Sequence, residues 1–302
     1  MAENDIDSPI VSVAELAANL GNADWVVIDC RFDLTDPEAG RAAWLAGRIP
    51  GAHYADLDRD LAAPLAGDGS GGRHPLPDAQ ALNDFFRRCG VHADSRVVAY
   101  DEVGNAIAAR LWWLLRWAGH RRGAVLDGGM TAWESAGHSL STNAQSTNAR
   151  PTGDGSFTAA VGAMPVVDAA AVETGLGTGE MILLDARADE RFAGRVEPLD
   201  KRAGHVPGAT NTPFQYNLAA DKCFLAPADL QAYYGASVDG IALEAGAMDQ
   251  VACMCGSGVT ACHTLLALEL AGLPGAALYA GSWSDWISDE GRSIATAAGA
   301  PE

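Results

Sequence analysis

The sequence has few cysteines and no long apolar run. Six cysteines among 302 residues are too few for a disulfide framework. The first ten residues, MAENDIDSPI, include acidic side chains and no apolar core, so no secretory signal is visible. No apolar stretch approaches the roughly 20 residues that a membrane span needs. These absences predict a cytoplasmic protein with free thiols and no membrane partner.

Basic residues are also scarce. The chain has 20 basic and 39 acidic residues, which gives a net charge of −19 at pH 7. This charge repels phosphate backbones and anionic lipids, so we expect neither nucleic acid nor a membrane surface as a partner. An anionic small substrate stays compatible with it, because salt screens charges beyond about 10 Å at 0.1 M. A hydrophobic content of 48% over 302 residues is enough for about two well-packed domains.

Four segments of the first half recur in the same order in the second half, which indicates an internal duplication. The pairs are residues 25–31 with 181–187, 46–52 with 203–209, 97–101 with 251–255, and 125–129 with 277–281. The spacing is nearly constant, since Asp185 follows Asp29 by 156 residues and Cys255 follows Asp101 by 154. The sequence therefore predicts two copies of one domain.

A segment rich in Ser, Thr, Asn, Gly and Pro separates the copies, at residues 139–156. Such a composition is typical of a linker. We place the domains at residues 1–140 and 157–302, with the linker at 141–156.

Each copy alternates short apolar runs with helical patterns. Buried parallel strands are expected at residues 26–28, 97–100 and 124–126, and helices at 107–117 and 264–270. Gly119 and Gly272 follow these helices and fit C-terminal caps. The alternation predicts an α/β protein with two tandem domains, each a mostly parallel central sheet flanked by helices. Sites in such sheets form in loops at the carboxyl ends of strands.

Cys255 lies in such a loop, between a predicted strand and a helical pattern. Backbone N–H groups at a helix N-terminus are unpaired and carry partial positive charge. Gly256 and Gly258 can take a positive φ, which lets successive N–H groups converge on one point. A thiolate at that point would be stabilised as a nucleophile, and the same groups would hold the outer sulfur of a persulfide.

Other interpretations of the cysteines carry less weight. Free cysteines are often buried structural thiols, and we assign Cys30, Cys89, Cys223, Cys253 and Cys262 to that class. A metal site at Cys253, Cys255, Cys262 and His263 lacks zinc-type ligand spacing. A cysteine phosphatase needs an arginine six positions after the nucleophile to hold a phosphate dianion, and Ala261 stands there.

Two segments carry a resemblance to a known family. Gly-His-Val-Pro-Gly at residues 204–208 and Cys-Gly-Ser-Gly-Val-Thr at 255–260 resemble the two-domain sulfurtransferases of the rhodanese family. Within it, the second segment resembles the 3-mercaptopyruvate sulfurtransferase branch. Thiosulfate-preferring members typically carry basic residues directly after the cysteine, whereas Gly256 and Ser257 stand there in this chain. Thiosulfate is a dianion that benefits from adjacent cations, while mercaptopyruvate carries one carboxylate.

The resemblance implies a sulfurtransferase that needs no metal or organic cofactor. Cys255 would take sulfur from 3-mercaptopyruvate, release pyruvate, and pass the sulfur to a thiol, thioredoxin, sulfite or cyanide. The first domain resembles the family's catalytically silent partner, because Asp101 takes the place of Cys255 and a carboxylate cannot accept sulfur.

Individual site residues follow from the same resemblance. Arg191 matches the family's substrate-binding arginine, and Arg202 is our choice for the second, with Arg195 in reserve. A Ser–His–Asp relay proposed for the mercaptopyruvate branch maps onto three residues of this chain, Ser257, His74 and Asp58. The loop residues that would contact the substrate are Gly256, Gly258, Val259 and Thr260, and Trp283 matches an aromatic residue near the family's site.

Two alternatives stay open at this point. The chain could be a thiosulfate sulfurtransferase that passes the sulfane sulfur to cyanide or a thiol. It could also be a non-catalytic binding protein on a rhodanese scaffold, because a fold alone does not establish chemistry. Such binding proteins usually lose the nucleophile, whereas this chain keeps Cys255.

Overall fold

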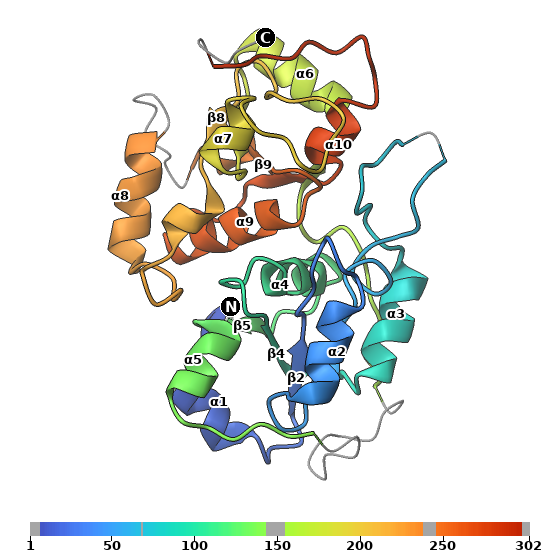
Figure 1. The fold of residues 1–302 in the computed structure, drawn as a ribbon, viewed down its shortest axis with the longest axis vertical. Helices are drawn as coiled ribbons and strands as arrows, with labels where there is room; N and C mark the ends of the chain where they lie inside the picture. Colours follow the sequence, from blue (N-terminus) through green and yellow to red (C-terminus); the bar gives the residue numbers. More distant parts are fainter. Residues whose placement is uncertain (1–6, 68, 143–154, 238–245, 298–302) are drawn as a thin grey trace. The chain divides into compact units, whose positions relative to one another are not determined.

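The computed structural model describes residues 7–67, 69–142, 155–237 and 246–297. The chain forms two compact units (Figure 1). The first consists of Met1–Ala63, Pro77–Ala163 and Ala220–Cys223, and the second of Pro64–Leu76, Met164–Ala219 and Phe224–Glu302. The expected boundary at residues 141–156 falls mostly outside the described residues. The unexpected feature is the early segment Pro64–Leu76, which packs with the second unit.

The first unit contains a five-stranded parallel sheet. Its strands, in spatial order, are β1 (Ile10–Val11), β5 (Gly123–Leu126), β4 (Arg96–Tyr100), β2 (Trp25–Asp29) and β3 (His53–Tyr54). Its helices are α1 (Val13–Asn19), α2 (Ala39–Ala46), α3 (Ala79–Arg88), α4 (Ala108–Trp117) and α5 (Gly129–Ser135). Ser12 and Asp78 begin α1 and α3 by accepting a backbone N–H of the first turn.

The second unit repeats this sheet strand for strand. The order is β6 (Val166–Val167), β10 (Ala277–Tyr279), β9 (Val251–Met254), β7 (Ile182–Asp185) and β8 (Thr210–Asn211). Its α-helices are α6 (Ala169–Thr178), α7 (Asp189–Phe192), α8 (Pro227–Ser237), α9 (Thr260–Leu270) and α10 (Ser282–Trp286), and its 3₁₀ helices are η1 (Phe214–Asn217) and η2 (Met248–Gln250). The expected α/β fold with two parallel sheets is confirmed.

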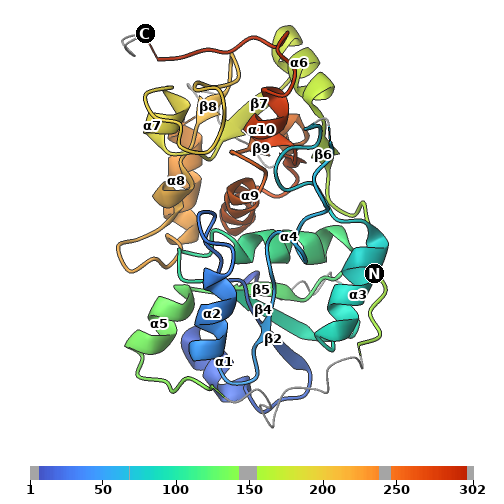
Figure 2. The same cartoon turned by 45° about the vertical axis from the view of Figure 1, so that its right-hand side comes forward.

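Helices cover both faces of each sheet, as Figure 2 shows. In the first unit, α1 and α5 pack against side chains of β2, β4 and β5 on one face, and α4 lies on the other. In the second unit, α6 and α10 cover one face and α9 the other. The strands are therefore buried on both sides, which explains why they are continuous apolar runs rather than alternating ones. Among the described residues, every helix is too short or too polar to cross a membrane.

The central helices α4 and α9 lie close to the positions predicted from the sequence. The glycine after each one, Gly119 and Gly272, has a positive φ, of 89° and 76° respectively, as a C-terminal cap requires. Helix α9 begins at Thr260, four residues before the expected start, and Thr264 is buried within it. The helix therefore starts directly after the Cys255 loop.

Candidate active site

Cys255 directly follows β9, and five residues separate that strand from α9. The Cys255 N–H donates to Ser282 Oγ at 3.0 Å, and the Cys255 carbonyl accepts from the Trp283 N–H at 3.0 Å. The Gly256 carbonyl accepts from the Ser284 N–H at 2.9 Å. The start of α10 therefore fixes the backbone of the cysteine loop. Cys255 itself is only 2% exposed.

The two loop glycines serve different purposes. Gly258 has a φ of 78°, and a Cβ on it would lie 2.3 Å from the Ala280 carbonyl oxygen, so this turn requires glycine. Gly256 lies outside the left-handed region, contrary to the expected role of a second left-handed turn. A Cβ on Gly256 would lie 3.1 Å from Arg73 Nη2 and 3.3 Å from Arg191 Nη2. The absence of a side chain there makes room for two guanidinium groups beside the cysteine.

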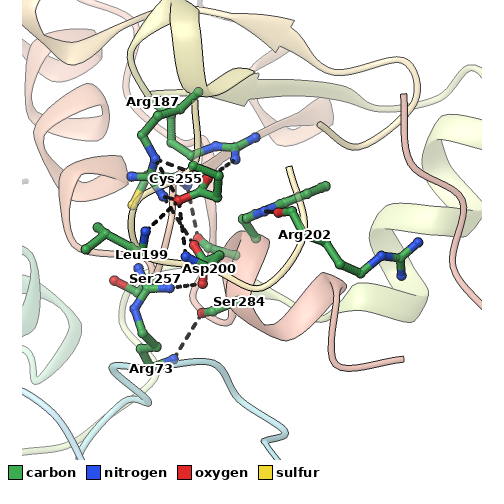
Figure 3. Close-up of polar contacts among 12 residues, drawn as sticks. Arg73, Arg187, Leu199, Asp200, Arg202, Cys255, Ser257 and Ser284 are labelled. Atoms are coloured by element: carbon green, nitrogen blue, oxygen red, sulfur yellow. Dashed lines mark hydrogen bonds and ion pairs between the residues drawn. The ribbon is translucent and has the colours of Figure 1, made fainter. Parts of the chain in front are cut away.

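Two buried carboxylates hold these guanidinium groups. Arg191 donates from Nη2 to Glu197 Oε1 at 2.7 Å and to Asp200 Oδ2 at 3.2 Å. Arg73 pairs with the other oxygen of Asp200. The side chains of Glu197 and Asp200 are each 4% exposed. Figure 3 shows Arg73, Asp200 and Ser257 grouped below Cys255. The arginines therefore have fixed positions before any ligand arrives.

A third arginine, Arg187, approaches Cys255 from the opposite side (Figure 3). It forms a bidentate pair with Asp185, at 2.7 Å from Nη2 to Oδ2, and lies over the Trp283 ring at 4.6 Å. Burial disfavours its charge, but Asp185, Glu197 and the Cys255 sulfur outweigh burial and raise the pKa of Arg187. A permanent positive charge therefore lies near the cysteine.

Ser257 and His74 are in direct contact. His74 Nδ1 lies 2.7 Å from Ser257 Oγ, and both residues are at most 5% exposed. The segment that carries His74 is anchored by its backbone, because the Gly71 N–H donates to Asp285 Oδ1 at 2.9 Å and the Arg73 N–H to Ser284 Oγ at 3.0 Å. The first two members of the expected relay are thus within hydrogen-bonding distance.

For three other predicted residues the structure gives local contacts only. Asp58 belongs to the first unit, where its N–H donates to Asp56 Oδ1 at 3.0 Å. Burial and the charge of Asp56 raise its pKa, and its part in the relay stays a prediction. The Arg202 side chain points away from Cys255 in Figure 3. Arg195 is exposed and pairs with Glu190 at 2.5 Å. Substrate binding by Arg202 or Arg195 stays a prediction.

Two of the predicted loop residues belong to the start of α9. Val259 is the N-cap and Thr260 the first helical residue, and the Val259 carbonyl accepts the Cys262 N–H at 3.1 Å. Trp283, the predicted aromatic, is fully buried, and its Nε1 donates to the Arg202 carbonyl at 2.9 Å. It packs against Arg187 and so shapes the site without an exposed surface.

The equivalent loop of the first unit shows how this turn treats an anion. Asp101 accepts four backbone N–H groups at 2.8–2.9 Å, from Val103, Asn105, Ile107 and Ala108. Burial raises its pKa, and those four hydrogen bonds oppose the rise. The Met130 N–H donates to the Asp101 carbonyl at 2.8 Å, as Trp283 does to Cys255. This strand-to-helix turn therefore gathers N–H donors around one negative group.

The remaining cysteines are surrounded differently. Burial raises the pKa of Cys30 and Cys253, that of Cys89 to about 12 and that of Cys223 to about 11. The Cys262 thiol donates to the Gly258 carbonyl at 3.3 Å. Over the part of the chain that the structure describes, no three His, Cys, Asp or Glu side chains gather as metal ligands. A raised pKa keeps Cys30, Cys89, Cys223 and Cys253 in the protonated form, which is a poor nucleophile.

Sequence reasoning missed four residues of this site, namely Arg73, Arg187, Glu197 and Asp200. A signal existed for Arg187, because the repeat conserves an Asp-x-Arg unit and Arg31 forms the same pair with Asp29 in the first unit. The other three give no local signal. Arg73 meets Asp200 across 127 residues of sequence, and only the fold brings them together.

Comparison with known proteins agrees with this geometry. The rhodanese-like domain matches twice, at residues 12–136 and 168–289. The chain is 47% identical over 288 residues to a Pseudomonas aeruginosa protein named a probable 3-mercaptopyruvate sulfurtransferase, covering 95% of this chain and 98% of the relative. It is 40% identical over 290 residues to a Mycobacterium tuberculosis protein provisionally named a thiosulfate sulfurtransferase, covering 94% and 96%.

A solved structure extends the comparison to the fold. The 3-mercaptopyruvate sulfurtransferase SseA from Escherichia coli superposes with a TM-score of 0.75 at 30% identity, covering 92% of this chain and 99% of that one. Both domains match the family, and the chain covers nearly the full length of its relatives. The cysteine loop agrees with this assignment. The chain belongs to the rhodanese family of two-domain sulfurtransferases.

Proposed function

We propose that the chain transfers sulfur from 3-mercaptopyruvate to a thiophilic acceptor through a persulfide on Cys255. One observation carries the proposal: two guanidinium groups and a Ser–His pair surround the cysteine loop. Arg73 Nη2 and Arg191 Nη1 lie within 3.4 Å of where a Gly256 side chain would begin. Two such groups can bind one carboxylate next to the nucleophile. The names of the P. aeruginosa and E. coli relatives support the same donor.

The first half-reaction moves the donor's sulfur to the enzyme. The donor carboxylate binds Arg73 and Arg191, which directs its thiol toward Cys255. The Cys255 thiolate attacks that sulfur, an S–S bond forms, and the C–S bond breaks with its electron pair moving into the pyruvate enolate. The enolate gains a proton at carbon to become pyruvate. Ser257, hydrogen-bonded to His74 at 2.7 Å, is placed to deliver that proton.

The second half-reaction transfers the sulfur from Cys255 to the acceptor. An acceptor nucleophile attacks the outer sulfur of the persulfide, and the Cys255 thiolate leaves. A small thiol, thioredoxin, sulfite and cyanide are all nucleophiles of the required kind. The two steps share no ternary complex, so the kinetics should be ping-pong. We propose the cytoplasm as the location, because a reducing compartment preserves a chain of six free thiols.

The persulfide is directly measurable. Incubating the protein with 3-mercaptopyruvate and no acceptor should add the mass of one sulfur to the peptide that contains Cys255, with release of one equivalent of pyruvate. Cys255→Ser should show neither change, while Cys223→Ser should show both. Continued turnover by the Cys255→Ser protein would exclude the proposal.

Thiosulfate remains a second candidate donor, supported by the M. tuberculosis relative. The loop lacks basic side chains at Gly256 and Ser257, but Arg73 and Arg191 supply cations at the same place from other segments. Loop composition alone therefore does not decide the donor. The ratio of kcat/KM for the two donors does, and we expect it to favour 3-mercaptopyruvate.

A further inference from the structure

The charges around Cys255 balance before any donor binds. Three arginines are paired with three carboxylates, and these are Arg73, Arg187, Arg191, Asp185, Glu197 and Asp200. The Arg187–Asp185 pair recurs as Arg31–Asp29 in the first unit, at nearly the same distances, so it belongs to the fold rather than to the donor. The charge that a donor meets is therefore set by the other four groups.

Asp200 holds the central position among those four. It contacts both arginines that flank Gly256, one through each carboxylate oxygen. Its own N–H donates to Glu197 Oε1 at 3.2 Å, which holds the segment in place. Its side chain is 4% exposed, so solvent screens its charge only weakly. A buried negative charge thus lies between the two cations that would bind the donor.

We propose that Asp200 is a specificity-determining residue, which restricts the enzyme to singly charged donors such as a thiol-bearing keto acid. This inference rests on the proposed function. With Asp200 and Glu197 both ionised, the four groups sum to a net charge of zero, so the site has no excess positive charge to offset a second negative charge on the donor. A dianion such as thiosulfate brings a second negative charge to a buried carboxylate. Asp200 therefore acts against the dianion while it also fixes the arginines that bind the monoanion.

The test compares donors in variants of the full chain. Asp200→Asn keeps the shape and removes the charge, and we expect the thiosulfate to 3-mercaptopyruvate ratio of kcat/KM to rise about tenfold or more, mainly through a lower KM for thiosulfate. Asp200→Glu restores the charge and should return the ratio toward the wild-type value. Glu190→Gln removes one charge next to Arg191 in sequence but from an exposed side chain, and it should leave the ratio unchanged.

Each outcome is decisive. A ratio that stays constant in Asp200→Asn while both donors weaken in parallel would show that Asp200 only positions Arg73, and would overturn the proposal. An equal rise in Glu190→Gln would show a general charge effect and would overturn it too. If Asp200→Asn does not fold, Asp200→Ser provides a smaller neutral side chain for the same comparison. Failure of the proposed function would appear separately, as a wild-type protein that gains no sulfur on Cys255 from 3-mercaptopyruvate.

Discussion

At the scale of single residues, the two loop glycines are needed for different reasons. Gly258 is needed for its backbone conformation, and Gly256 for the space that a missing side chain leaves. Gly258 adopts a left-handed φ of 78° against the Ala280 carbonyl, whereas Gly256 faces the guanidinium ends of two arginine side chains. Contact with backbone cannot be relieved by a rotamer change, while contact with a guanidinium end can be. Two glycines that look equivalent in the sequence should therefore respond differently to the same substitution.

Gly258→Ala and Gly256→Ala test this difference. We expect Gly258→Ala to lower the free energy of unfolding by roughly 1–3 kcal/mol and to abolish most turnover, because the loop must move. Gly256→Ala should leave stability within about 0.5 kcal/mol and raise the KM for the donor, because a methyl group displaces the guanidinium ends. Urea unfolding and steady-state kinetics measure both effects. Equal loss of stability in the two variants would contradict the assignment.

The Asp200 carboxyl also predicts a pH dependence. Burial and then the charge of Glu197 raise its pKa, against the opposing charges of Arg73, Arg191 and Arg187. As the pH falls below neutrality, Asp200 therefore gains a proton earlier than an exposed aspartate would, and its negative charge disappears. We expect the thiosulfate to 3-mercaptopyruvate ratio of kcat/KM to rise on acidification.

A change in the reactivity of Cys255 affects both donors, so it cancels in this ratio. The Asp200→Asn variant provides the control, because it has no carboxyl to titrate and its ratio should stay flat between about pH 8 and about pH 5. A wild-type ratio that is equally flat would mean that Asp200 keeps its charge over this range or does not influence the donor.

At the scale of elements, the strand-to-helix turn has two versions in one chain. In the first unit, Asp101 provides the anion and four backbone N–H groups bind it. In the second unit, Cys255 stands at the same place after β9, held through its own carbonyl in the same way. The two copies therefore share the strand-to-helix position and the carbonyl contact, while the occupying group differs and the second turn is two residues shorter.

Asp101→Asn should measure how much this element contributes to stability. An amide has one oxygen, so two of the four N–H groups would face an N–H₂ group instead of an acceptor. We expect a loss of about 2 kcal/mol in the free energy of unfolding, measured from the urea midpoint at constant slope. Burial raises the pKa of Asp101, so the buried charge reduces the stability of the folded protein, but the four hydrogen bonds to backbone N–H groups oppose this effect. Asp84→Asn, on an exposed face of α3, should stay within about 0.5 kcal/mol, and a stabilised Asp101→Asn protein would show that charge burial dominates.

Local patterns were enough to predict these elements from the sequence. Strands buried on both faces leave uninterrupted apolar runs, as at residues 97–100 of β4, and a left-handed glycine ends each central helix. The repeat identified Cys255 as the residue that differs from Asp101 at a matching position. The arginine and carboxylate partners could not be found in this way, because their identity depends on contacts between distant segments. His74 and Ser257 meet across 183 residues, and only the family resemblance connected them in advance.

At the scale of the whole molecule, the early segment Pro64–Leu76 is part of the second compact unit. It supplies Arg73 and His74, and its backbone donates to the side chains of Ser284 and Asp285 in α10, the element that also holds the cysteine loop. A division of the chain at its linker would therefore separate the nucleophile from two of the groups around it. The duplication created two domains in sequence, but the catalytic unit combines parts of both halves of the chain.

Replacing residues 64–76 with a Gly/Ser linker of equal length tests what this segment contributes to the catalytic unit. The loop around Cys255 keeps its contacts with α10, so the nucleophile should survive, and the thiol should still react with a small alkylating reagent. Arg73, which we propose to bind the donor, and His74, the Ser257 partner, are lost, so we expect persulfide formation from 3-mercaptopyruvate to slow by at least about 100-fold. The double variant Arg73→Ala/His74→Ala removes the same side chains but keeps the backbone contacts of Gly71 and Arg73. If it loses as much activity as the linker variant, the side chains account for the effect; if it retains most of the wild-type rate while the linker variant does not, the segment acts by supporting α10, and the roles given to Arg73 and His74 are wrong.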